Sequence, residues 1–138
     1  MKTIKQISIF LENQRGKLSD ILTALKYENI EIQAASVADT IDYGILRLIT
    51  SNQMKASELL SAKGHLVIIN EVLAIEVESD TAAFANAIDV LTSGGCTINY
   101  LYTFHKAGKL VLIIRPSNLE KAEKVALSNG LNLIRGWE

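Results

Sequence analysis

Hydrophobic residues in the first half of the chain follow two alternating kinds of spacing. They occur at every second position over residues 7–11, which predicts a strand with one buried face. Leu18, Ile21, Leu22 and Leu25 instead recur every three or four positions, which predicts an amphipathic helix over residues 18–28. The same spacings continue to residue 69 and predict a strand hairpin at 30–38 and 45–49, a helix between Asn52 and Gly64, and a strand at 66–69.

The second half of the chain repeats the first half after a shift of 66 positions. The residues expected to begin and end helices recur as well, since Ser51-Asn52 returns as Ser117-Asn118 and Gly64 returns as Gly130. Each copy therefore has the order strand-helix-strand-strand-helix-strand. The second set of elements is expected at 73–77, 84–91, 97–104, 110–115, 119–128 and 131–135. We predict two domains, residues 1–70 and 71–138.

This order of elements predicts an α+β fold built from two ferredoxin-like units. Right-handed crossovers would place both helices of a unit on one face of its antiparallel sheet. Pairing between the hairpin strands at residues 30–38 and 97–104 would hide an exposed edge of each sheet. We therefore expect the units to lie side by side in one eight-stranded antiparallel sheet with the helices on one face.

Composition and charge exclude several classes of protein. The formal net charge of −1 provides no basic surface for nucleic acid or anionic lipid. Cys96 is the only cysteine, so neither a disulfide within the chain nor a cysteine cluster for zinc can form. The sequence has no run of 18 apolar residues and no signal-peptide pattern. A cytoplasmic protein without membrane or nucleic-acid partners is expected.

No set of residues in the sequence is typical of a catalytic or metal site. Neither His65 nor His105 has a companion that suggests a catalytic triad. Asp39 and Asp42 lie at the predicted hairpin turn, where such side chains usually stabilise the turn rather than bind metal. We expect no catalytic residue, no metal and no cofactor.

The polar loop between the first strand and the first helix is the strongest candidate for ligand binding. Backbone N–H groups at the start of a helix favour an anion such as an α-carboxylate. Gly16 lets a ligand approach the main chain, and Asn13 carries an amide that can both donate and accept hydrogen bonds. The equivalent loop of the second copy has Ala82 in place of Gly16 and adds Asp80, so it should bind a carboxylate less readily.

The loop sequence Asn13-x-Arg15-Gly16-x-Leu18 resembles that of the ACT domain, which usually has Asn or Asp followed by Pro-Gly and Leu. Residues 38–47 and 98–104 are similar to the hairpin segments of small bacterial tandem-ACT proteins, so the resemblance covers the whole chain. It implies a regulatory protein that binds an amino acid between paired ACT units, and that can form a homodimer. Arg15 departs from the family pattern by replacing proline, which loosens the loop and adds a cation.

The resemblance also implies which residues bind the ligand. The first-loop wall would consist of Asn13, Gln14, Arg15, Gly16, Lys17 and Leu18, and the opposite wall of Tyr100, Leu101 and Tyr102. A second, weaker site would pair Asp80 and Thr81 with Ala35 and Ser36.

Two other functions stay open at this point. Small acyl-phosphate hydrolases share the element order and bind phosphate through an arginine near the first loop, where this chain has Arg15, although their glycine-rich loop is missing. RNA-recognition modules also share the order, but they need aromatic residues on the two central strands and a basic surface. Tyr100, Tyr102 and Phe104 alternate on a hairpin strand instead and are expected to pack at an interface. The leading prediction is a non-catalytic amino-acid sensor.

Overall fold

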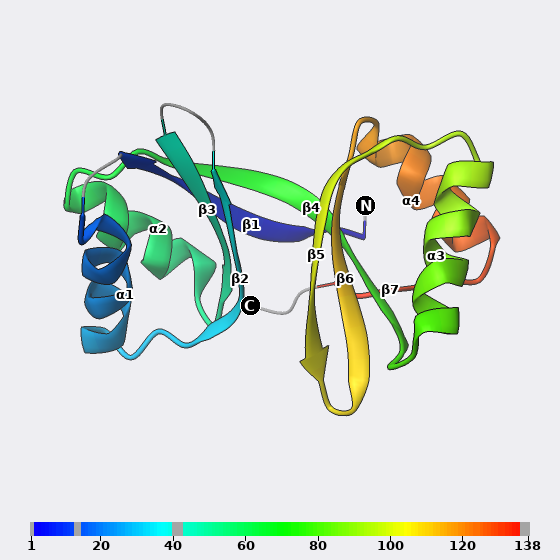
Figure 1. Ribbon diagram of the computed structural model, residues 1–138, viewed down its shortest axis with the longest axis horizontal. Helices are drawn as coiled ribbons and strands as arrows, with labels where there is room; N and C mark the ends of the chain where they lie inside the picture. The colour runs from blue at the N-terminus through cyan, green and yellow to red at the C-terminus, as the bar shows by residue number, and fades with distance from the viewer. Residues whose placement is uncertain (1, 13–14, 40–42, 136–138) are drawn as a thin grey trace. The chain divides into compact units, whose positions relative to one another are not determined.

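The computed structural model describes residues 2–12, 15–39 and 43–135, which form two compact units (Figure 1). We call Lys5–Asn70 the N-terminal unit and residues 71–135, together with residues 2–4, the C-terminal unit. The described chain is α+β, with seven strands and four helices. Within the described residues, no helix combines the length and apolar character needed to cross a membrane.

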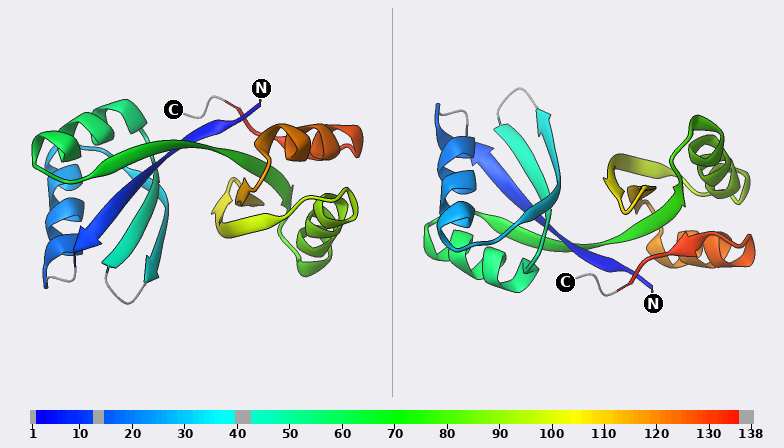
Figure 2. Two further views of the ribbon diagram at one scale, coloured as in Figure 1. Left: turned by 90° about the horizontal axis from the view of Figure 1, so that it is seen from above. Right: turned by 90° about the horizontal axis from the view of Figure 1, so that it is seen from below.

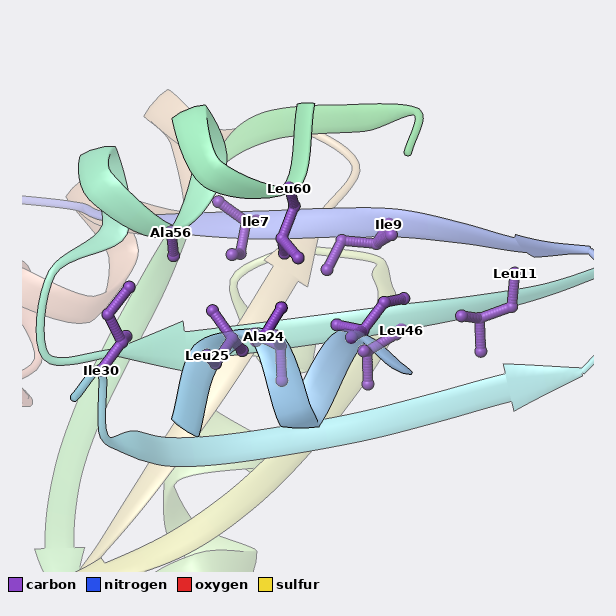
Figure 3. Close-up of a cluster of buried hydrophobic side chains, with 11 residues drawn as sticks. Ile7, Ile9, Leu11, Ala24, Leu25, Ile30, Leu46, Ala56 and Leu60 are labelled. Carbon is purple, nitrogen blue, oxygen red and sulfur yellow. The ribbon is translucent and has the colours of Figure 1, made fainter. Parts of the chain in front are cut away.

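The N-terminal unit has two helices packed on one face of an antiparallel sheet. Its strands lie in the order β2-β3-β1-β4, and the register pairs Ile9 with Leu46 and Val37 with Leu46. Figure 3 shows side chains of both helices meeting those of β1 and β3 in the core of this unit. The elements are β1 (Ile4–Glu12), α1 (Lys17–Tyr27), β2 (Ile32–Asp39), β3 (Tyr43–Thr50), α2 (Gln53–Ala62) and the start of β4 (Val67–Glu78).

The C-terminal unit has the same arrangement. Strand β4 lies between β6 and the short β7, and β6 also pairs with β5, all antiparallel. Helices α3 and α4 lie on one side of this sheet (Figure 2). Their buried faces join its core through residues such as Leu91 and Ala126. The elements after β4 are α3 (Thr81–Ser93), β5 (Ile98–Lys106), β6 (Lys109–Pro116), α4 (Leu119–Ser128) and β7 (Asn132–Leu133).

Local sequence explains where the helices begin and end. The backbone N–H of Lys55 donates to the Asn52 side chain at 3.0 Å, and Asn118 caps α4 in the same way. Gly64 and Gly130 follow α2 and α4 with φ of 90° and 74°, in the left-handed region that glycine adopts without strain. The predicted caps at both helices are confirmed.

The number of strands differs from the expected eight. The strands predicted at 66–69 and 73–77 are one strand, β4, because the three linking residues, Asn70, Glu71 and Val72, continue the extended backbone instead of turning. The predicted eight-stranded sheet is therefore wrong in its strand number. In the described residues β2 pairs with β3, and β5 pairs with β6, each within its own unit.

Candidate functional site

Helix α1 begins without the side-chain cap that the other helices have. Gly16, immediately before it, has φ 88° and ψ −7°, and a Cβ added there would meet no atom within 4 Å. Among the described residues no side chain caps α1, whereas Asn52, Asp80 and Asn118 cap α2, α3 and α4. The first N–H groups of α1 are therefore available to a ligand, and the positive end of the helix favours an anion there.

A hollow of about 440 Å³ lies beside this helix end, and we call it the first-loop pocket. Its volume is within the range of small-molecule pockets, roughly 300–1,000 Å³. It forms where β1 ends and the β2–β3 hairpin begins to turn, because Gly44 pairs with Leu11 on one side and with Asp39 on the other. The lining residues are Leu11, Glu12, Gly16, Lys17, Leu18, Val37, Asp39 and Gly44.

The first-loop pocket carries charges of both signs. Lys17 adds a cation to the positive end of α1, while Glu12 and Asp39 supply two carboxylates. Leu11 and Val37 contribute apolar surface to the same pocket. This combination suits a small molecule with an anionic group, a cationic group and a carbon skeleton.

Gly44 shapes the pocket wall. It is buried, and a Cβ at this position would lie 3.3 Å from the carbonyl oxygen of Ala38 and 3.6 Å from Leu11. A larger residue would therefore press on the hairpin and on β1 at the point where both border the pocket.

His65 lies close to the same loop. The backbone N–H of Phe10 donates to the carbonyl of Leu66 at 3.1 Å, which places His65 beside the end of β1. Burial lowers the pKa of His65 below its ordinary value of 6.5, and Lys17 and Lys63 act in the same direction. Its imidazole is therefore neutral at pH 7.

The lowered pKa of His65 predicts a loss of stability in acid. The unfolded chain binds the proton more readily than the folded chain, so the stabilising contribution is complete above pH 6.5 and is lost as the pH falls below 6.5. We expect the urea midpoint of the wild type to fall more between pH 7.5 and 5.5 than that of His65→Leu. Equal decreases in the two proteins would contradict this prediction.

The structure describes only part of the predicted first-loop wall. Gly16, Lys17 and Leu18 line the pocket, and Arg15 lies exposed beside them. Asn13 and Gln14 lie outside the described residues. The pocket residues that the sequence did not assign to a site are Leu11, Glu12, Val37, Asp39 and Gly44. Asp39 and Gly44 were recognisable as hairpin-turn residues, and the strand order places that turn next to the first loop.

The residues predicted for the opposite wall belong to β5 of the C-terminal unit. Tyr100 and Tyr102 are half-buried and share one face of the strand. Leu101 faces the other way and packs against the core of its own unit. Tyr100 and Tyr102 thus lie on the face of the sheet away from the helices, opposite to Leu101.

The second loop differs from the first as its sequence predicts. The Asp80 carboxylate accepts a hydrogen bond from the backbone N–H of Ala83 at 2.7 Å and so occupies the positive end of α3. Thr81 begins that helix and is exposed. Ala35 and Ser36 lie on β2, exposed and half-buried. A carboxylate already at the end of α3 disfavours a second anion there.

The structure also brings together one pair that the sequence did not suggest. His105 Nε2 lies 3.0 Å from Ser79 Oγ, and both side chains are exposed at the surface. Exposure to water leaves this pair without the enclosed surroundings that activate a nucleophile. In the described parts of the chain, no three His, Cys, Asp or Glu residues gather closely enough to hold a metal ion.

Comparison with known proteins agrees with this architecture. A solved structure, protein BT0572 from Bacteroides thetaiotaomicron, is 34% identical over 99% of this chain and 94% of that one, with a TM-score of 0.91. The ligand-free regulatory subunit of aspartate kinase from Thermus thermophilus is 17% identical, with a TM-score of 0.62 over 91% of this chain and 92% of that one. The subunit from Thermus flavus is 16% identical, with a TM-score of 0.60 over 90% of each chain. A search of curated proteins finds no match.

At 17% and 16% identity, the aspartate kinase subunits show only that the fold is shared. The family is assigned from the sequence. The model of a family described as an ACT domain pair matches residues 2–137. That match spans both repeats and both units of the structure. The chain therefore belongs to the ACT domain family, as a pair of ACT domains.

Proposed function

We propose that this protein is a regulatory protein without catalytic activity, and that it binds an amino acid in the first-loop pocket. The observation that carries the proposal is the pairing of an uncapped helix end and Lys17 with the carboxylates of Glu12 and Asp39 in one hollow. An α-amino acid has a carboxylate and an ammonium group on one carbon atom. The pocket offers a partner for each group.

The proposed binding mode follows from the charges. The ligand carboxylate accepts hydrogen bonds from the backbone N–H groups at the start of α1 and pairs with Lys17. The ligand ammonium group lies toward Asp39 and Glu12, and the side chain contacts Leu11 and Val37. Gly16, immediately before α1, has a φ of 88°, in the left-handed region that glycine adopts without strain.

In this proposal the site is completed where two ferredoxin-like ACT units meet, with Tyr100 and Tyr102 as the opposite wall. The fold shared with aspartate kinase regulatory subunits supports a role in regulation rather than in chemistry. A ligand bound by two units stabilises one arrangement of them over others, which is how binding becomes a signal. The second loop, with Asp80 at the end of α3, binds more weakly or not at all.

A thermal-shift panel of the twenty proteinogenic amino acids tests the proposal. A ligand at 100 times its Kd stabilises a protein by about 2.7 kcal/mol, which raises Tm by several degrees. We expect at least one amino acid to produce such a shift. Lys17→Gln should remove most of it, whereas Lys26→Gln, in the exposed last turn of the same helix, should retain it.

Two results would contradict the proposal. The first is a panel in which no amino acid changes Tm. The second is hydrolysis of an acyl phosphate that disappears in Arg15→Ala, because that result would support the enzyme alternative instead.

A further inference from the structure

His65 is a polar residue placed where the fold does not need one. Its Nδ1 is buried and has no hydrogen-bond partner in the described parts of the chain. A buried nitrogen without a partner destabilises the folded state, because it has lost its hydrogen bonds to water. Such an orphaned group calls for an explanation other than packing.

The second repeat shows what packing alone prefers at this position. Leu131 is the residue equivalent to His65, and it packs against the core of the C-terminal unit. The backbone is the same in both copies: His65 N–H donates to Leu60 at 3.1 Å, and Leu131 N–H donates to Ala126 at 3.0 Å. One fold position therefore carries a leucine in one unit and an unsatisfied imidazole in the other.

The imidazole lies among the charged groups that border the first-loop pocket. Glu12 at the end of β1 and Lys17 at the start of α1 line that pocket, and both act electrostatically on His65. Asp20 of α1 and Lys63, just after α2, are the other charged groups that act on it. Lys17 and Lys63 disfavour a proton on His65, while Asp20 and Glu12 favour one.

We propose that His65 links ligand binding in the first-loop pocket to proton uptake. Burial, Lys17 and Lys63 together disfavour a proton on His65, and a carboxylate bound next to Lys17 offsets the contribution of that lysine, so the imidazole binds a proton more readily when the anion is bound. Conversely, a protonated His65 adds a positive charge beside the pocket and strengthens the binding of a carboxylate. This inference rests on the proposed anion-binding role of the pocket and adds a pH dependence to it.

The first experiment follows His65 by NMR, with sodium acetate as a plain carboxylate probe and sodium chloride at equal ionic strength as the reference. We expect acetate to raise the pKa of His65 by about half a unit and to leave the exposed His105 unchanged. Lys17→Gln should raise the pKa of His65 in chloride and reduce the effect of acetate. His65→Leu, which introduces the residue of the second repeat, assigns the signal. An unmoved His65, or an equal shift of His105, would overturn the proposal.

A second experiment separates this proposal from the amino-acid proposal. For an amino acid found in the thermal-shift panel, we expect about threefold tighter binding at pH 5.5 than at pH 7.5, since one proton changes affinity by at most tenfold per pH unit. This difference should disappear in His65→Leu. Equal affinity of the wild type at both pH values would overturn the proton link and leave the amino-acid role intact. A panel in which no amino acid binds, together with an acetate effect on His65, would contradict the amino-acid role and leave the proton link intact.

Discussion

Replacing Gln53 with leucine is expected to destabilise the N-terminal unit by about 3 kcal/mol or more. The Gln53 side chain is 2% exposed, and its Nε2 donates to the carbonyls of Lys5 at 2.8 Å and Leu48 at 2.9 Å. Its Oε1 accepts from the N–H of Thr50 at 2.9 Å and from the Thr50 hydroxyl at 2.6 Å. Leucine would remove all four hydrogen bonds, three of which lie in a buried region. Urea denaturation followed by circular dichroism measures the loss.

The second repeat explains why only one unit needs this glutamine. The residue equivalent to Thr50 is Pro116, which has no N–H, and the residue equivalent to Gln53 is Leu119. Thr50→Val in the Gln53→Leu background should recover part of the stability, because it removes a hydroxyl that has lost its hydrogen-bond acceptor, at the cost of the weaker contact from the Asn52 N–H at 3.3 Å. Gln33→Leu, at an exposed position on β2, is the control and should change stability by less than about 0.5 kcal/mol. A loss below about 1 kcal/mol for Gln53→Leu would show that the four hydrogen bonds contribute little.

Replacing Leu25 with alanine is expected to cost about 2–5 kcal/mol, because Leu25 is fully buried in the core beneath α1. Leu22→Ala is a matched control on the same helix. Leu22 is 37% exposed, so its truncation should cost less than about 1 kcal/mol. Chemical denaturation of both variants gives the comparison.

The Leu25 variant also tests the connection between the core and the pocket. Helix α1 carries Gly16 at its start and Lys17 in its first turn, so loosening its packing should also reduce any ligand-dependent rise in Tm. Equal losses of stability in Leu22→Ala and Leu25→Ala would mean that α1 is not anchored through the face that the structure shows. A full ligand-dependent rise in Tm in Leu25→Ala would show that ligand binding in the pocket does not depend on the packing of α1.

Most of the local structure could be predicted from the sequence. Helix α4 begins at Leu119 and ends at Ser128, as its periodicity predicts, because its cap and its apolar spacing are properties of adjacent residues. Of the predicted first-loop wall, Gly16, Lys17 and Leu18 line the pocket, and their role in ligand binding stays a prediction. Gly16 is expected from the sequence to let a ligand approach the main chain, and the structure shows its backbone in the left-handed region.

Other features depend on contacts between residues far apart in the sequence. The helical pattern assigns Leu18, Ile21, Leu22 and Leu25 to one apolar stripe, but the sheet covers only Ile21 and Leu25, and the other two are more than a third exposed. Asp39 joins the pocket because β2 and β3 bring the hairpin back to the end of β1. No spacing of residues along the chain predicts that Asp39 lies next to the end of β1.

The sequence by itself determined the repeat, the order of most strands and helices, and the caps of α2 and α4, and it predicted the loop most suited to an anion. These features follow from the preferences of residues close together in the chain. Only the tertiary structure merged two predicted strands into β4, enclosed the polar groups around Gln53, and brought His65 under the electrostatic influence of Lys17. Burial and electrostatic fields arise from all the neighbours in space, and those neighbours are known only once the strands have paired and the helices have packed.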